Sequence, residues 1–153
     1  MATSAYLDGL KMLARRELSE AQVRQRLSRR GHEPESIDAA VERLKNERAI
    51  DDVRTAEAIA RTETTIKRRG RLRVRRQIEQ AGIAPTTARR AVDEIFEDID
   101  DRALIEASLA KRLRNRTLIA DDREFQKLYR YLIAQGFEAD SVMLTLTARR
   151  RQA

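Results

Sequence analysis

The chain has 153 residues, a length that suits one domain or a short string of small repeats. Its 32 Lys and Arg outnumber 25 Asp and Glu, which gives a formal charge of +7 and predicts a polyanionic partner. The absence of Cys excludes a disulfide framework, a thiolate zinc site and a thiol nucleophile. No secretory signal or membrane-length apolar run is evident, and only five Gly and two Pro are present, so we expect a basic, mostly helical, cytoplasmic protein with no membrane partner.

An internal repeat organises the sequence. Gly31, Gly82 and Gly136 follow one another at intervals of about fifty residues, and each lies within the same apolar pattern. The matching apolar positions lie eight and four residues before each glycine and six and ten residues after it: Val23, Val74 and Leu128; Leu27, Ile78 and Leu132; Ile37, Ala88 and Val142; Val41, Val92 and Leu146. This set of columns predicts three copies of one structural unit.

Each copy is expected to form three helices. Apolar residues four apart before the glycine share one helix face, and the glycine supplies the left-handed residue that ends this helix. Pro34 and Pro85 suit the first turn of the following helix. Units of this size stack on their neighbours. We therefore predict an all-α fold of three tandem three-helix repeats, forming an elongated, curved body, over residues 1–50, 51–99 and 100–153.

The first helix of each copy is expected to be the longest. In the first copy its apolar residues are Tyr6, Leu10 and Leu13. In the second copy it is expected to begin near Asp51, a suitable N-cap, and to run through Val53, Ala56, Ala60 and Ile66. In the third copy it is expected to run from about Asp101 through Leu104, Leu109 and Leu113. Asp121 and Glu124 resemble a capping pair for the next helix, which is predicted to bury Phe125, Leu128 and Leu132.

The densest charge lies in the second copy, between positions 67 and 76. Its basic residues are Lys67, Arg68, Arg69, Arg71, Arg73, Arg75 and Arg76, and the run holds no acid. Lys67 to Arg69 suit the negative end of a helix dipole, whereas the arginines from Arg71 onward are expected at a helix start, where the dipole opposes them. Arginine grips phosphate and carboxylate groups in a bidentate manner. We therefore favour contact with a polyanion over a merely solvated face.

Other basic groups are weaker candidates for the same contact. In the first copy they are Arg24, Arg26, Arg29 and Arg30, for which contact and a solvated helix end are equally favoured. In the third copy they are Lys127 and Arg130. The tail from Arg149 to Arg151 is expected to be a loose basic end.

No catalytic, cofactor or metal site is expected. The acidic run holds Asp93, Glu94, Glu97, Asp98, Asp100 and Asp101, which are expected to offset nearby arginines. His32, the only histidine, is expected to be half-buried and structural. The chain has no phosphate-binding GxxxxGK[ST] motif, no GxGxxG motif and no serine in a nucleophile setting, so an enzyme is not expected.

Several short motifs follow one another along almost the whole chain. They are Leu13–Ser19 with Val23, Leu27 and Arg30–Gly31; Leu44 with Ile50–Arg54 and Ala56; Arg69–Gly70 with Arg75–Ile78 and Ala81–Ile83; and Leu132 with Gly136–Phe137 and Val142. In this order and spacing they resemble the RecX family of bacterial regulators of the RecA recombinase.

This resemblance implies a curved stack of three-helix repeats that lies in the groove of a RecA filament on DNA. It implies a regulator in recombination and the SOS response that mainly inhibits RecA ATP hydrolysis, strand exchange and co-cleavage. We expect a monomer with a weak DNA contact of its own. Which helices contact RecA and which contact DNA stays open. The alternative is a protein that binds nucleic acid directly through helix pairs like helix-turn-helix units.

Overall fold

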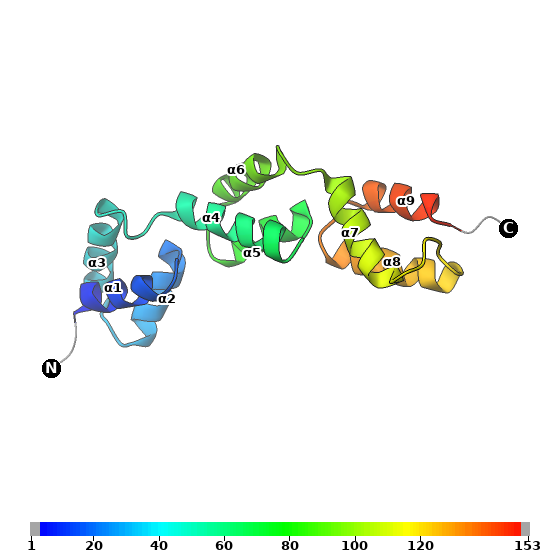
Figure 1. The fold of residues 1–153 in the computed structure, drawn as a ribbon. Coiled ribbons are helices and arrows are strands. Elements are labelled where there is room, and N and C mark those ends of the chain that lie inside the picture. The colour runs from blue at the N-terminus through cyan, green and yellow to red at the C-terminus, as the bar shows by residue number, and fades with distance from the viewer. Residues whose placement is uncertain (1–3, 151–153) are drawn as a thin grey trace. The chain divides into compact units, whose positions relative to one another are not determined.

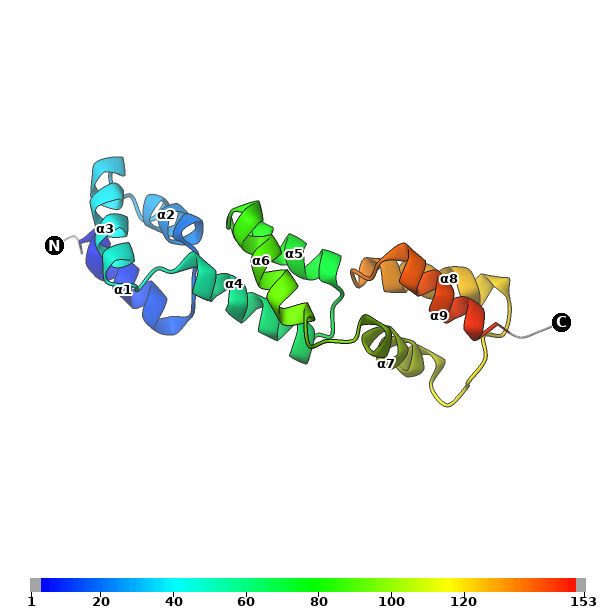
Figure 2. The same cartoon turned by 90° about the horizontal axis from the view of Figure 1, so that it is seen from above.

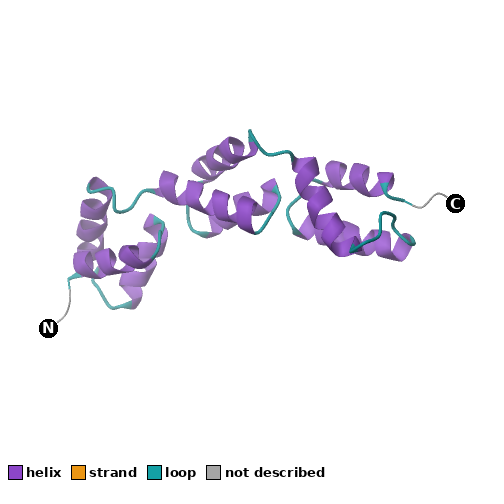
Figure 3. Cartoon of the chain, viewed as in Figure 1, coloured by secondary structure: helices purple, strands orange, loops and turns teal. Residues whose placement is uncertain are grey.

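The structure, a computed structural model, describes residues 4–150 as helices joined by loops (Figures 1 and 3). The α-helices are α1 (Ala5–Arg15), α2 (Glu20–Arg29), α3 (Pro34–Asn46), α4 (Asp52–Arg61), α5 (Arg71–Gln80), α6 (Pro85–Phe96), α7 (Asp101–Leu113), α8 (Asp122–Ala134) and α9 (Ala139–Ala148). Within this range there is no strand, and one isolated bridge pairs Ile119 with Arg150. The all-α prediction is confirmed. None of the described helices has the length and apolar character needed to cross a membrane.

The turn between the second and third helices is the same in each repeat. Gly31, Gly82 and Gly136 have φ angles of +89°, +82° and +100°, which a residue with a side chain adopts only at a cost. Pro34 and Pro85 open α3 and α6, where the missing N–H is no loss. The periodic glycines and prolines therefore mark the helix ends that the sequence predicts.

The first repeat has its own apolar core, built by α1, α2 and α3. Figure 2 shows these three helices grouped together. The aliphatic residues at its centre are fully or almost fully buried: Leu18, Val23, Leu27, Val41 and Leu44. Tyr6, Leu10 and Leu13 pack at the edge of this core. The predicted apolar faces of all three helices therefore meet in one cluster.

The third repeat forms a second core from α7, α8 and α9. Its buried residues include Ile105, Leu109, Leu113, Phe125, Leu128, Leu132, Phe137, Val142 and Leu146. Asp121 caps α8 because its carboxylate accepts the backbone N–H of Glu124 at 2.8 Å. The predicted start and buried face of α8 are both confirmed.

The first helix of the second repeat begins as predicted but buries fewer of the expected apolar side chains. Asp51 caps α4 as expected, and Ala56 and Ala60 are buried. Val53 and Ile66, however, are exposed to 51% and 75%. The segment Thr62–Ile66 continues α4 as a π-helical turn, in which Glu63 and Thr64, rather than Ile66, are the buried side chains.

The chain divides into two compact units. One comprises the chain up to Ile59 together with Gln77–Ala91, and the other comprises Ala60–Arg76 together with the chain from Val92 onward. The first unit contains the core of α1–α3, and the second contains the core of α7–α9. The helices of the second repeat contribute residues to both units.

Candidate functional site

The basic run of the second repeat crosses the break between the π-helical turn and α5. Lys67 is paired with Glu63 one turn earlier at 3.1 Å. Arg68 lies at the break with a φ angle of +54° and is exposed. Arg69 is half-buried, and its Nε and Nη1 atoms are buried without a hydrogen-bond partner in the described part of the chain.

The two arginines nearest the start of α5 are held by the fold. Arg71 pairs with Asp93 of α6 at 2.8 Å, and its guanidinium lies 5.0 Å from the centre of the Phe96 ring. Arg73 donates a hydrogen bond to the carbonyl oxygen of Ala134 at 3.0 Å. The helix dipole disfavours positive charge at a helix start. The contacts of Arg71 and Arg73 within the chain offset this unfavourable interaction.

Further along α5, Arg75 is half-buried and Arg76 is exposed. Neither Arg68 nor Arg76 forms an ion pair with any residue between 4 and 150. Arg68 and Arg76 are therefore the exposed arginines of this run whose guanidinium groups are available to bind a partner.

In the first repeat the arginines also differ in their surroundings. Arg24 joins α2 to α3, since it pairs with Glu20 at 3.0 Å and with Asp38 at 2.7 Å. Arg30 lies 3.3 Å from the carboxylate of Asp8. Arg29 is exposed and Arg26 half-buried, and neither is ion-paired within the described residues.

Lys127 and Arg130 of the third repeat are exposed on α8. Next to them on the same helix, Tyr131 is half-buried, and the guanidinium of Arg112 stacks over its ring at 3.8 Å. The Tyr131 ring therefore serves as packing between α7 and α8.

The prediction of a loose basic tail is wrong for Arg149 and Arg150; Arg151 lies outside the described residues. Arg149 pairs with Glu106 at 2.7 Å and donates to the carbonyl of Thr117. The backbone N–H of Ile119 donates in turn to the carbonyl of Arg149 at 2.8 Å. Arg150 lies 4.4 Å from the centre of the Phe125 ring. The end of the chain thus straps the loop between α7 and α8.

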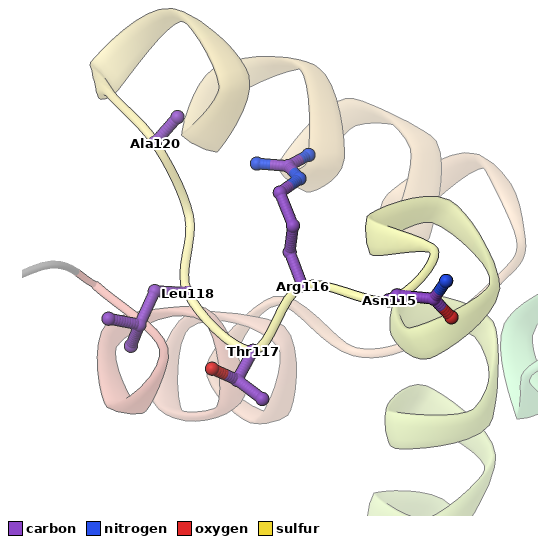
Figure 4. A pocket seen from close by; sticks show the side chains of 5 residues that line it. All are labelled: Asn115, Arg116, Thr117, Leu118 and Ala120. Carbon is purple, nitrogen blue, oxygen red and sulfur yellow. The ribbon is translucent and has the colours of Figure 1, made fainter.

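The same loop borders an open hollow of about 320 Å³, lined by Asn115, Arg116, Thr117, Leu118 and Ala120 (Figure 4). Arg116 extends toward α8 and forms two hydrogen bonds to the carboxylate of Glu124, at 2.9 and 2.6 Å. With the backbone N–H of Ala120 as a third donor, these bonds lower the pKa of Glu124 to about 2.

The acidic run mostly serves the helices next to it. Asp93 pairs with Arg71, and Asp100 caps α7 by accepting the backbone N–H of Arg102. Burial raises the pKa of Asp101 above its ordinary value, and the nearby Arg71 guanidinium opposes this effect. Among residues 4–150, no three acidic or histidine side chains converge as a metal site requires.

His32 pairs with an acid that the sequence did not single out. Its Nε2 atom lies 2.6 Å from Oδ2 of Asp8, a side chain buried in α1. This hydrogen bond is the main cause that lowers the pKa of Asp8. The signal was an acid among the apolar residues on the inner face of α1, between Ala5 and Met12.

A family model, solved structures and related sequences all match this chain to RecX proteins. A model of the first three-helix domain of RecX matches residues 5–44. The crystal structure of RecX from Lactobacillus salivarius has a TM-score of 0.78 at 20% identity, over 94% of this chain and 93% of that one. A second crystal structure, of a regulatory protein RecX, has a TM-score of 0.74 at 21% identity, over 92% of this chain and 69% of that one. These two likenesses show a shared fold.

Sequence identity extends the likeness from fold to family. A regulatory protein RecX from Halorhodospira halophila is 32% identical over 149 residues, which cover 96% of this chain and 89% of that protein. Another, from Syntrophotalea carbinolica, is 29% identical over 136 residues, covering 88% and 89%. With this identity across almost its whole length, and with three-helix units that each turn at a left-handed glycine, the chain belongs to the RecX family of regulatory proteins.

Proposed function

We propose that this chain is a non-enzymatic, cytoplasmic regulator that binds RecA filaments on DNA as a monomer. In this role it mainly inhibits RecA ATP hydrolysis, strand exchange and co-cleavage, in recombination and the SOS response. The observation that carries the proposal is the match to regulatory RecX proteins over 96% of the chain. Exposed basic side chains in all three repeats support it, because a filament of protein on DNA offers acidic groups at regular intervals.

The contact is spread over three repeats. We assign it to Arg68 and Arg76 in the second repeat, Arg26 and Arg29 in the first, and Lys127 and Arg130 in the third. Each exposed charge contributes little alone. Several weak contacts along a periodic lattice nevertheless gain affinity through effective concentration, because each bound repeat keeps the next one close to its site.

Some of the basic residues act on this contact indirectly. Arg24, Arg30, Lys67, Arg71 and Arg73 already have partners within the chain. Arg69 and Arg75 belong to the same basic run and are half-buried. In this proposal these residues hold the helices that present the uncommitted side chains.

The proposal is tested by RecA ATP hydrolysis on single-stranded DNA, with the chain added below the concentration of RecA. We expect inhibition by the natural chain and weaker inhibition by an Arg68→Glu/Arg76→Glu variant. An Arg15→Glu/Arg16→Glu variant is the matched control, since it reverses two exposed charges outside the assigned contact. If the natural chain leaves the rate unchanged, the proposed function is wrong. Equal inhibition by all three proteins would remove Arg68 and Arg76 from the contact.

Direct binding of nucleic acid is the competing function. It predicts tight binding to DNA without RecA and a steep fall of affinity with salt, because each phosphate contact releases counterions. Titration of DNA alone at several salt concentrations separates the two, since filament regulation predicts only weak binding under these conditions.

A further inference from the structure

A helix start and a glycine turn from different repeats meet in the first unit. The hydroxyl of Ser19, the N-cap of α2, donates a hydrogen bond to the carbonyl of Ala81 in the turn between α5 and α6. The next residue of that turn is Gly82, and a Cβ added there would overlap the side chain of Ala21 in α2. The turn therefore accepts this helix start only because both sides are small.

The second unit contains the same arrangement, made by the next pair of repeats: the start of α5 docks on the glycine turn between α8 and α9. The backbone N–H of Gly70, just before α5, donates to the carbonyl of Gln135 at 2.8 Å, and that of Leu72 donates to Gly136 at 3.1 Å. A Cβ on Gly70 or on Gly136 would overlap the backbone of the opposite segment. Gly70 and Ser19 occupy the same place in the repeat, four residues before Val74 and Val23.

The equivalent turn of the first repeat has no such neighbour among residues 4–150. Gly31 has the same left-handed backbone as Gly82 and Gly136, and it is exposed. Apart from its two neighbours in the chain, no described residue has an atom within 4 Å of a Cβ built on Gly31. Arg30, like Ala81 and Gln135, is the residue before the glycine of its turn. Its carbonyl is therefore the counterpart of the two carbonyls that accept hydrogen bonds from a helix start in the other repeats.

A second copy of this chain is poorly suited to the Gly31 turn. Counted back from the glycine of each repeat, the residue that corresponds to Ser19 and Gly70 is Glu124, a long side chain in the first turn of α8 that is already bound by Arg116. The start of α8 is further covered by Arg150, which lies 3.3 Å from the carboxylate of Asp122 and stacks on Phe125. The third repeat therefore resembles a capping unit rather than one that docks onto another glycine turn.

We propose that the Gly31 turn binds the N-terminal end of a helix in the filament protein, a helix with a small first residue and an acid in its first turn. The two internal contacts define the small first residue of this occupant, because both dock a helix start with Ser or Gly at the contact point. Arg29 beside the turn, which is exposed and makes no ion pair within the described residues, favours an acid in the position that Glu20 has at the start of α2. The inference rests on the proposed function, which supplies the filament as the partner.

A Gly31→Asn variant tests this surface without disturbing the chain. Asparagine tolerates a left-handed backbone, and the space around Gly31 is open, so the melting temperature is expected to stay nearly unchanged. The new side chain would occupy the place of the docking helix. We therefore expect equilibrium binding to RecA filaments on single-stranded DNA to weaken by about tenfold or more. The control is Ala84→Asn, which adds the same side chain at an exposed residue directly before Pro85 in the second repeat.

A second variant, Arg29→Glu, keeps the glycine and the Arg30–Asp8 pair, and it is expected to weaken the same binding. Filament binding by both variants equal to that of the natural chain would overturn the inference and leave the proposed function standing. No binding by the natural chain would instead overturn the proposed function, and with it the partner assigned here. Concentration-dependent self-association that Gly31→Asn abolishes would also overturn the inference, because the occupant would then be a second copy.

Discussion

Arg71 and Arg73 show how one residue type serves two purposes in this chain. Both carry a positive charge at the start of α5, and their charge alone predicts that they bind a partner. Asp93, Phe96 and the carbonyl of Ala134 give them partners inside the chain. The exposed Arg68 and Arg76 of the same run make no ion pair within the described residues, so charge density in sequence and availability to a partner are different properties.

The low pKa of the Glu124 carboxylate predicts how the stability of the fold depends on pH. With a pKa of about 2 in the folded chain and about 4.3 when unfolded, Glu124 stabilises the fold above pH ~4.5, and this contribution is lost as the pH falls toward 2. Because its side chain is 26% exposed, we expect Glu124→Gln to lower the free energy of unfolding by about 1–2 kcal/mol at pH 7. Urea denaturation at pH 7 and pH 3 measures the difference, which should be smaller at pH 3. A Glu42→Gln control at an exposed position should show no such loss, and a loss for Glu124→Gln that does not change with pH would contradict this account.

The contacts of Arg149 predict an effect of its substitution on stability and on amide exchange in the loop before α8. Arg149 holds the loop before α8 through Glu106 and the carbonyl of Thr117. Arg149→Ala is expected to cost about 1–2 kcal/mol of stability, since it removes two hydrogen bonds with charged groups at a partly buried site. It should also speed amide exchange at Ile119, whose N–H donates to the carbonyl of Arg149. Unchanged exchange in hydrogen–deuterium measurements would show that the strap does not order the loop.

At the scale of the elements, the glycine turns and the apolar columns could be predicted from sequence, because both repeat in step with the helices. The π-helical turn could not, since nothing local in Thr62–Ile66 favours it over an ordinary α-helical turn. The Asp8–His32 pair and the strap at Arg149 join residues far apart in the chain. Such contacts depend on how helices pack, which a single sequence does not display.

Helix docking in the second unit predicts the effect of a single methyl group. Gly70→Ala would drive its Cβ into the backbone of Gly136 and Phe137, neither of which can move without breaking the turn. We expect a loss of about 2–3 kcal/mol in the free energy of unfolding. Thermal melting followed by circular dichroism measures it, and an unchanged melting temperature would contradict the close approach seen here.

The start of α2 allows a graded version of the same test. Ser19 is the N-cap of α2, part of a capping box with Gln22, and the donor to Ala81. Ser19→Ala is expected to cost about 1–2 kcal/mol, whereas Ser19→Gly should cost less because glycine is a tolerated N-cap. Chemical denaturation of the two variants provides the comparison, and a greater loss for the glycine variant would be inconsistent with a role in capping.

Two properties of the chain as a whole bear on its partner. Its basic residues are divided between helix positioning and exposed surface, and its repeats present a left-handed glycine turn three times, of which the Gly31 turn has no neighbouring helix start in the described chain. Both properties suit a protein that meets a large regular partner rather than a small ligand.

The central claim is that the partner is a filament of RecA on DNA and not the DNA alone. Equilibrium binding of the labelled chain to RecA-coated and to bare single-stranded DNA, measured at one salt concentration near physiological, tests it most directly. We predict binding to the filament that is at least about tenfold tighter than binding to bare DNA, and a loss of filament affinity in Arg68→Glu/Arg76→Glu. Equal affinity for both DNA forms, or tighter binding to bare DNA, would contradict the account.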